Sequence, residues 1–221
     1  MRPVIIIGTT SFSAMFRKII ETEKYKVLGF STRRAFCMGG GKLEGLDVFP
    51  FEDLASHFDM KEVQCLNTIG YSQMNGIRAK MFLDILNAGY DNMTFISSRA
   101  NVYSNEIGQG SIIMPGAFVG PDVKLGTSCV VYSNVSLTHH ISVGNYCFIG
   151  SGTVVGGGTR IENNCFLGLN STIKNRIHLA PYTLVGSGSN VIRSVDSEAC
   201  VCVGNPAKVI EGKKSLEIKS I

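Results

Sequence analysis

The sequence of 221 residues contains no tryptophan, only six prolines and only four histidines. It also lacks the run of about 20 apolar residues that a membrane-spanning helix needs. The apolar stretch near its start is too short for a secretory signal and has no cleavage-like site. The net charge of +4 is small, and neither half of the chain is a basic arm. These absences argue against membrane and nucleic-acid partners and favour a cytoplasmic protein.

Cysteine usage also excludes some classes of protein. The seven cysteines are odd in number and contain no Cys-x-x-Cys pair, which favours reduced thiols over disulfides or a metal site. Three of them, Cys129, Cys147 and Cys165, are equally spaced along the chain. Because their interval equals one coil of the repeat in the second half of the sequence, we interpret these three as a stacked column of small core residues.

What the sequence has in abundance is a repeat. From Ile107 to Val191 every sixth residue is Ile, Leu or Val, without a break. A six-residue unit with one inward branched side chain suits a short strand followed by a tight turn, and three units close a coil of about 18 residues. Stacked coils pair as parallel strands about 4.8 Å apart and bury their apolar columns against one another. The pattern therefore predicts a parallel β-helix over residues 99–206, followed by a C-terminal tail at 207–221.

Residues 1–98 alternate between buried strands and helical spacing, which predicts a parallel α/β domain with ligands beyond the carboxyl ends of its strands. The first strand-to-helix turn has one glycine and not Gly-x-Gly-x-x-Gly, so hydride transfer on a dinucleotide is unsupported. This turn can offer N–H and hydroxyl groups to a phosphate or ribose, and equally Ser11 or Ser13 could only cap the helix. The candidate residues are Gly8, Thr9, Thr10 and Ser11.

Three segments carry a family resemblance: "GLDVFPFEDL" at 45–54, "THHISVGNY" at 138–146 and "VGNPAKVI" at 203–210. With them the chain resembles, over nearly its whole length, the hexapeptide-repeat N-acetyltransferases of bacterial sialic-acid and bacillosamine biosynthesis. The resemblance implies a Rossmann-like α/β N-terminal domain followed by a left-handed parallel β-helix. It further implies acetyl transfer from acetyl-CoA to a nucleotide-linked amino sugar, in surface-glycan biosynthesis, by a homotrimer with active sites between subunits.

The same resemblance assigns roles to residues. His139 occupies the position of the general base, with His140 beside it, both in outward-facing positions of their hexad. Gly157, one coil further along, would bind the thioester carbonyl through its backbone N–H, and the three successive glycines at 156–158 are expected to leave their N–H groups accessible. Further contacts with coenzyme A are implied for Leu169, Ser187 and Lys208.

The chain departs from the family pattern at three places. His140 stands where relatives usually have Asp or Glu to orient the base, so another carboxylate does this work or His139 has less support. Tyr132 replaces a usual asparagine, with Asn134 two residues along, which makes both candidates for holding a different sugar. Thr32 and Arg33 stand near the usual acidic residue after the second strand, so dTDP-, GDP- and CMP-linked sugars all remain open. Arg33 could face a phosphate or be ordinary surface.

Two other functions remain compatible with the sequence: an O-acetyltransferase of the same fold, and a non-catalytic trimeric scaffold. A zinc-dependent carbonic anhydrase, which also uses this type of helix, is disfavoured because a His-x-x-x-x-His spacing is absent. We expect no metal in the reaction and no acylated cysteine.

Overall fold

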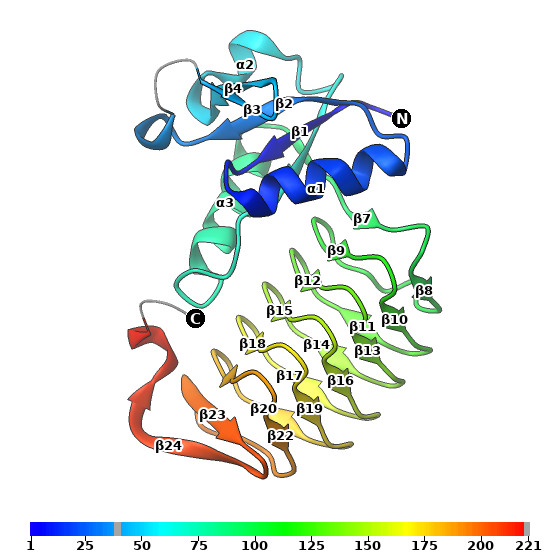
Figure 1. Cartoon of the computed structure of the whole chain (residues 1–221), viewed down its shortest axis with the longest axis vertical. Coiled ribbons are helices and arrows are strands. Elements are labelled where there is room, and N and C mark those ends of the chain that lie inside the picture. Colours follow the sequence, from blue (N-terminus) through cyan, green and yellow to red (C-terminus); the bar gives the residue numbers. More distant parts are fainter. Residues whose placement is uncertain (38–40, 219–221) are drawn as a thin grey trace. The chain divides into compact units, whose positions relative to one another are not determined.

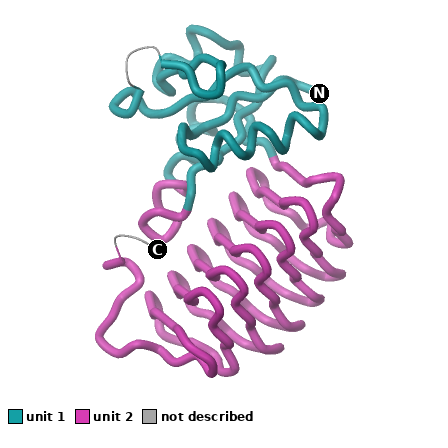
Figure 2. The backbone as a smooth tube through the Cα atoms, in the orientation of Figure 1, with its two compact units in different colours: residues 1–70, 80–93 teal, residues 71–79, 94–221 magenta. Residues whose placement is uncertain are grey.

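The computed structural model describes residues 1–37 and 41–218, and the chain divides into two compact units (Figure 2). Unit 1 comprises residues 1–70 and 80–93, and unit 2 comprises 71–79 and 94–221. The second unit thus begins at residue 94 and also takes in a short earlier segment, residues 71–79. Among the described residues no helix is long and apolar enough to cross a membrane.

Unit 1 is built on one sheet with the strand order β3-β4-β2-β1-β5-β6. Its centre is β1, four branched residues that are all buried and that pair in parallel with β2 and β5. Only β3 runs antiparallel to its neighbour. The strands are β1 (Val4–Ile7), β2 (Val27–Thr32), β3 (Lys42–Leu43), β4 (Leu46–Pro50), β5 (Gln64–Asn67) and β6 (Asp91–Asn92).

The helices of the first hundred residues follow strands, as the alternating pattern predicts. They are α1 (Ser11–Thr22), α2 (Leu54–His57) and α3 (Gly76–Asn87), with short 3-10 turns η1 (Arg34–Phe36) and η2 (Phe51–Asp53). Helix α1 has a strongly one-sided apolar face, and it buries Ala14, Phe16 and Ile20. The first turn of α3 belongs to unit 2.

Unit 2 is a parallel β-helix whose coils follow one another in one direction (Figure 1). Its first sheet contains β8 (Asn101–Val102), β10 (Phe118–Val119), β13 (Ser136–Leu137), β16 (Val154–Val155), β19 (Thr172–Ile173) and β22 (Asn190–Val191). The second contains β11 (Lys124–Leu125), β14 (Ser142–Val143), β17 (Arg160–Ile161) and β20 (His178–Leu179). The third contains β7 (Phe95–Ile96), β9 (Ile112–Ile113), β12 (Val130–Val131), β15 (Phe148–Ile149), β18 (Phe166–Leu167), β21 (Leu184–Val185), β23 (Cys200–Gly204) and β24 (Ala207–Lys214).

The register of the coils is the one that the hexad spacing predicts. Leu137 pairs with Val155, and Val155 with Ile173, so residues separated by three hexads stack on each other. Every apolar hexad position from Ile113 to Val191 is buried, and together they line the interior of the coils. The prediction of a parallel β-helix is therefore confirmed, because each coil covers the apolar residue of the one before it.

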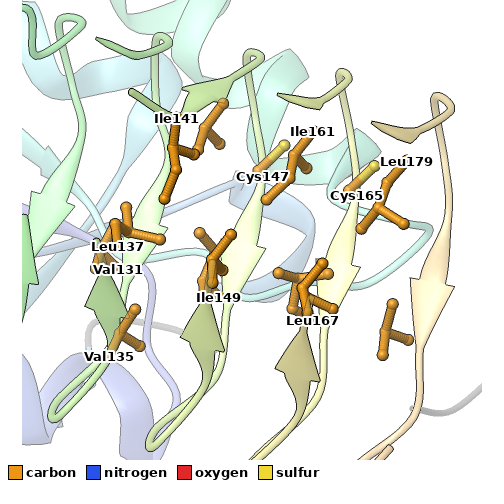
Figure 3. Close-up of a cluster of buried hydrophobic side chains, with 14 of the residues drawn as sticks. Val131, Val135, Leu137, Ile141, Cys147, Ile149, Ile161, Cys165, Leu167 and Leu179 are labelled. Carbon is orange, nitrogen blue, oxygen red and sulfur yellow. The ribbon is translucent and has the colours of Figure 1, made fainter. Parts of the chain in front are cut away.

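The column of cysteines is core, as interpreted from the sequence. Cys129, Cys147 and Cys165 are fully buried, and Figure 3 shows Cys147 and Cys165 among the branched side chains of the interior. The thiol of Cys147 donates to the carbonyl of Glu162 at 3.1 Å. Burial, followed by its contacts with Cys129 and Cys165, raises the pKa of the Cys147 thiol well above its ordinary value. A thiol held protonated in this way is a poor nucleophile.

The expected tail at 207–221 begins as a strand. Residues 207–214 form β24, which turns back antiparallel to β23 and ends the third sheet. A 3-10 turn, η3 (Ser215–Glu217), follows, and the buried hydroxyl of Ser215 donates to the carbonyl of Tyr182 at 2.6 Å. Residues 219–221 of the expected tail lie outside the described residues.

The segment 71–79 is fastened to the β-helix by buried contacts. The ring of Tyr71 lies 5.0 Å from that of Phe148 and 4.9 Å from that of Phe166. Asn164 donates from Nδ2 to the carbonyl of Met74 at 3.2 Å. Arg78 is fully buried and donates from Nε to the carbonyl of Ser128 at 2.8 Å, and burial lowers the pKa of its guanidinium to about 10.

Candidate active site

From residue 110 to residue 188 every turn between strands of the β-helix passes through a residue with left-handed backbone, and one corner gathers the candidate catalytic groups. We call this turn, between the first and second sheets, the histidine corner; it consists of residues 121–122, 139–140, 157–158 and 175–176. Its left-handed residues, one from each successive coil, are Asp122, His140, Gly158 and Arg176, with φ between 52° and 70°. Stacking of the coils therefore places these four residues in one column.

His139 and His140 lie side by side at this corner, both exposed. Their rings are nearly perpendicular, at 87°, with centroids 5.2 Å apart. The two Nδ1 atoms are 3.0 Å apart, a distance at which one must donate and the other accept. On the far side of the His140 ring, Nε2 lies 3.3 Å from Oδ2 of Asp122. The carboxylate comes from the equivalent position of the preceding coil.

Gly157 lies directly against the ring of His139. A Cβ atom at this position would lie 2.3 Å from Cε1 and 2.5 Å from Nε2 of the imidazole, far inside contact distance. Only glycine at 157 allows the ring to occupy this place. The glycine seen one coil along in the sequence is therefore in van der Waals contact with the candidate base.

The expectation that residues 156–158 leave their N–H groups accessible holds for only one of the three. Gly156 donates to the carbonyl of Ile173 at 2.9 Å, and Gly158 donates to the carbonyl of His139 at 3.1 Å. The N–H of Gly157 makes no hydrogen bond within the described part of the chain. The regular pairing of the coils uses the outer two amides and leaves the middle one for a ligand.

A cavity of about 320 Å³ opens beside the two histidines, lined by His139, His140, Gly157, Gly158, Asn175 and Arg176. Asn175 and Arg176 were missed in the sequence. They stand one coil after Gly157 and Gly158, so the period that relates His139 to Gly157 would have found them. They add an amide and a positive charge to the wall of the cavity.

The implied coenzyme A residues do not meet His139 within one chain. Leu169 and Ser187 lie at the turn between the third and first sheets, which we call the leucine corner; it consists of residues 133–134, 151–152, 169–170 and 187–188. They stack on each other, since Gly188 donates to the carbonyl of Leu169 at 2.8 Å. Leu169 is 54% exposed, which is high for a leucine. Lys208 is exposed on β24.

Tyr132 and Asn134 also belong to the turn between the third and first sheets and not to the histidine corner. Tyr132 is half-buried, with its ring 6.0 Å from that of Phe148, and burial raises the pKa of its hydroxyl. Asn134 is exposed and takes the left-handed conformation, with φ of 60°. Neither side chain lines the cavity beside His139.

In unit 1 the turn after β1 is tightly built. Gly8 has φ of 130°, and a Cβ there would lie 2.5 Å from Oγ of Ser13 and 2.9 Å from Oγ1 of Thr68. The N-cap of α1 is Thr10 and not Ser11, which is the first helical residue, and Thr10 makes no side-chain cap bond. Both residues are exposed.

Thr9, in the turn after β1, lines a second cavity of about 170 Å³ in unit 1. The other lining residues come from β3, from β4 and from the segment between β2 and β3, and they comprise Phe36, Cys37, Gly41, Lys42, Leu43 and Val48. The turn after a parallel strand, to which Thr9 belongs, is where α/β domains commonly bind ligands.

Arg33 is engaged by carboxylates. Its guanidinium forms an ion pair with Asp84, lies 3.6 Å from Glu52 and stands 5.2 Å over the ring of Phe51. Burial tends to raise the pKa of Glu52, but backbone N–H bonds and the charge of Arg33 outweigh it and lower that pKa. The neighbouring Thr32 ends β2 and is half-buried. Arg33, which could have faced a phosphate, is thus paired with carboxylates of η2 and α3.

Within residues 1–37 and 41–218, no three His, Cys, Asp or Glu side chains group together as metal ligands.

Comparison with known proteins agrees with this architecture. Residues 140–175 match the family model described as bacterial transferase hexapeptide (six repeats). No curated protein sequence matches the chain. Among solved structures, the acetyltransferase domain of PglB from Neisseria gonorrhoeae aligns with a TM-score of 0.83 at 19% identity, covering 95% of this chain and 100% of that one.

Two further structures extend the likeness. A histidine-to-asparagine variant of perosamine N-acetyltransferase from Caulobacter crescentus, in complex with CoA and GDP-perosamine, aligns with a TM-score of 0.84 at 20% identity, covering 94% of this chain and 96% of that one. WeeI from Acinetobacter baumannii aligns with a TM-score of 0.60 at 17% identity, covering 95% of this chain and 100% of that one. At these identities the likeness establishes a shared fold, and the chain carries the hexapeptide repeat of bacterial transferases.

Proposed function

We propose that the protein is an acetyl-CoA-dependent N-acetyltransferase that acts on a nucleotide-linked amino sugar in bacterial surface-glycan biosynthesis. One observation carries the proposal: the exposed imidazole of His139 lies against Gly157, whose N–H has no partner in the described chain. A base and an oxyanion donor thus stand next to each other at the wall of an open cavity. Acyl transfer needs these two groups in this proximity.

The chain's own residues would act as follows. Nε2 of His139 takes the proton that the attacking amine loses as the carbon–nitrogen bond forms. The N–H of Gly157 donates to the thioester oxygen while that atom carries negative charge, a contribution typically of about 3 kcal/mol. His139 then returns its proton to the thiolate of coenzyme A as the carbon–sulfur bond breaks. The reaction yields an amide and free coenzyme A, and it involves none of the buried cysteines.

The structures of the same fold support this choice of substrates. One was solved with acetyl coenzyme A and others with CoA and GDP-perosamine, and two of them carry a replaced histidine. By analogy, the polar turn of Gly8, Thr9, Thr10 and Ser11 would hold the nucleotide in a Rossmann-like unit 1, with acetyl-CoA on a left-handed β-helix. GDP-, dTDP- and CMP-linked amino sugars are the candidates to test.

The proposal includes a cytoplasmic homotrimer with active sites between subunits. Leu169, Ser187 and Lys208 lie away from the histidine corner within one chain. One molecule of coenzyme A can touch both groups of residues if the leucine corner of a second copy lies beside the histidine corner of the first. The same packing would bring Tyr132 and Asn134 to the sugar.

The test is acetyl transfer followed by mass spectrometry, with a panel of GDP-, dTDP-, UDP- and CMP-linked 3- and 4-amino sugars. We expect an acetylated amino sugar from the native protein and a rate lower by about 100-fold or more in His139→Ala, the contribution of a general base. His178→Ala is the matched control, since His178 lies on the outer face of the same β-helix; its rate should stay within about twofold.

The other outcomes decide between the alternatives. Undiminished product from His139→Ala removes that residue from the mechanism. Acetylation of a hydroxyl but of no amine would make the protein an O-acetyltransferase. Failure to bind acetyl-CoA by calorimetry would leave a trimeric scaffold as the better interpretation.

A further inference from the structure

The candidate base has no carboxylate as its direct neighbour, because His140 occupies that position. The coil stacking nevertheless brings one within reach. Asp122 stands one coil before His140, in the same left-handed column, and its Oδ2 lies 3.3 Å from Nε2 of His140. The other ring nitrogen of His140 lies 3.0 Å from Nδ1 of His139. Three side chains from two coils thus form a continuous line that ends at the candidate base.

We propose that Asp122 and His140 are positioning residues that together replace the single carboxylate, with His140 transmitting the effect of Asp122 to His139. This inference rests on the proposed function, in which His139 is the base. It assigns to His140 an orienting role and not contact with the substrate.

The chemistry of the three groups fixes the direction of each contact. A carboxylate only accepts, so Asp122 favours the His140 tautomer that carries its proton on Nε2. Nδ1 of His140 then has a free lone pair and accepts from Nδ1–H of His139. With its proton held on Nδ1, His139 presents an unprotonated Nε2, the atom that lies against Gly157 and that must take the proton of the amine.

The surroundings hold the line in place. The backbone N–H of His140 donates to the carbonyl of Pro121 at 3.0 Å, which ties the turn of one coil to the turn that carries Asp122. The His139 ring packs against the backbone of Gly157, where no side chain intervenes. When His139 becomes protonated, the negative charge of Asp122 lies beyond one imidazole ring and stabilises the cation through the polarised His140.

A substrate-free measurement tests the tautomers. In protein labelled with ¹⁵N-histidine, long-range proton–nitrogen spectra should show His139 protonated on Nδ1 and His140 on Nε2, with signals assigned by single substitution of the four histidines. In Asp122→Ala both residues should become mixtures of tautomers. Unchanged tautomers in Asp122→Ala, or the opposite tautomers in the native protein, would overturn the proposal.

Kinetics test the transmission through His140. We expect Asp122→Ala to lower kcat about 10-fold with KM changed less than about twofold, comparable with the low end of the losses seen when the partner of a metal-ligating histidine is removed. Asp122→Asn, which keeps an acceptor but loses the charge, should fall in between. In a His140→Asp background, where a carboxylate adjoins His139 directly, Asp122→Ala should have no further effect. An equal loss in both backgrounds would contradict the relay.

Asp196→Ala is the matched control, because Oδ1 of Asp196 lies 2.9 Å from Nδ1 of His178 in an aspartate–histidine pair elsewhere on the β-helix. It should leave kcat unchanged. The two measurements distinguish failure of the proposed function from failure of this inference. If the histidines show the expected tautomers but the protein has no turnover, only the proposed function is refuted. If turnover occurs and does not depend on Asp122, only this inference is refuted.

Discussion

The histidine corner and the leucine corner share a backbone feature and differ in their side chains. Both place a left-handed residue at the same point of each of their four turns. The leucine corner fills these positions with Asn134, Gly152, Asn170 and Gly188, the residue types that tolerate this conformation best. The histidine corner fills its positions with Asp122, His140, Gly158 and Arg176, of which only Arg176 is a type that this conformation does not favour. Three of its four residues therefore carry an ionisable side chain, whereas none of the four at the leucine corner does.

The comparison shows that the backbone of a turn in this β-helix does not by itself determine what the turn does. Strand pairing fixes where each residue of a corner stands, and the residue types then decide what the corner can do. The leucine corner presents small polar groups and one exposed apolar side chain, which suits the flank of a long ligand. The histidine corner presents ionisable groups around one open N–H, which suits chemistry.

The largest effect on activity is expected when a side chain is introduced at Gly157 in the histidine corner. Gly157→Ala should lower the rate of acetyl transfer by about 100-fold, because the new methyl displaces the His139 ring and crowds the free N–H. Gly70→Ala is the control, since a Cβ there meets nothing within 4 Å. Steady-state turnover by mass spectrometry, with circular dichroism to check folding, measures both. A fully active Gly157→Ala would show that the ring and the glycine need not touch.

A smaller effect is expected at the leucine corner. Leu169→Ala should raise KM for acetyl-CoA about 10-fold and leave kcat within about twofold, because most of an apolar side chain is lost from binding and not from the reacting centre. Leu216→Ala, which removes a leucine of similar exposure (56%) from η3, should change neither constant. A fall in kcat at constant KM would mean that the two corners do not divide their work in this way.

The smallest effect on activity is expected inside the coils. Cys147→Ala should leave turnover within about twofold and lower the free energy of unfolding by about 1 kcal/mol, because it removes a buried group of methylene size. Urea denaturation of the variant and of Cys37→Ala, a half-buried cysteine of unit 1, would compare the two sites. Abolished turnover in a stable Cys147→Ala protein would instead place the thiol in the chemistry.

The contacts of the site that the sequence can predict are those set by the regular spacing of the coils. The contact between His139 and Gly157 follows from their separation by one full coil, and the same arithmetic would have given the contact between Asp122 and His140. In unit 1 no such rule applies. The pairing of Arg33 with Asp84 joins the end of β2 to α3, far apart in the sequence, and only the packing of the folded unit brings them together.

Two features of the fold escaped prediction for a similar reason. The spacing of α3 predicts a helix, but the attachment of residues 71–79 to the β-helix depends on the Tyr71 ring packing against the stacked rings of Phe148 and Phe166. Residues 207–214 lie beyond the hexad series, which ends at Val191, so no sequence period predicts a strand there. Their pairing with β23 arises because that strand offers a free edge.

That returning strand has a consequence for the molecule as a whole. A stack of parallel coils is open-ended, and its last edge could in principle accept a coil from another chain and so seed fibres. Strand β24 covers the last edge of the third sheet with a strand of opposite direction, and it carries exposed lysines at 208, 213 and 214. Charged edge strands discourage pairing between chains. Strand β24 thus ends the third sheet with a charged edge that discourages pairing with another chain.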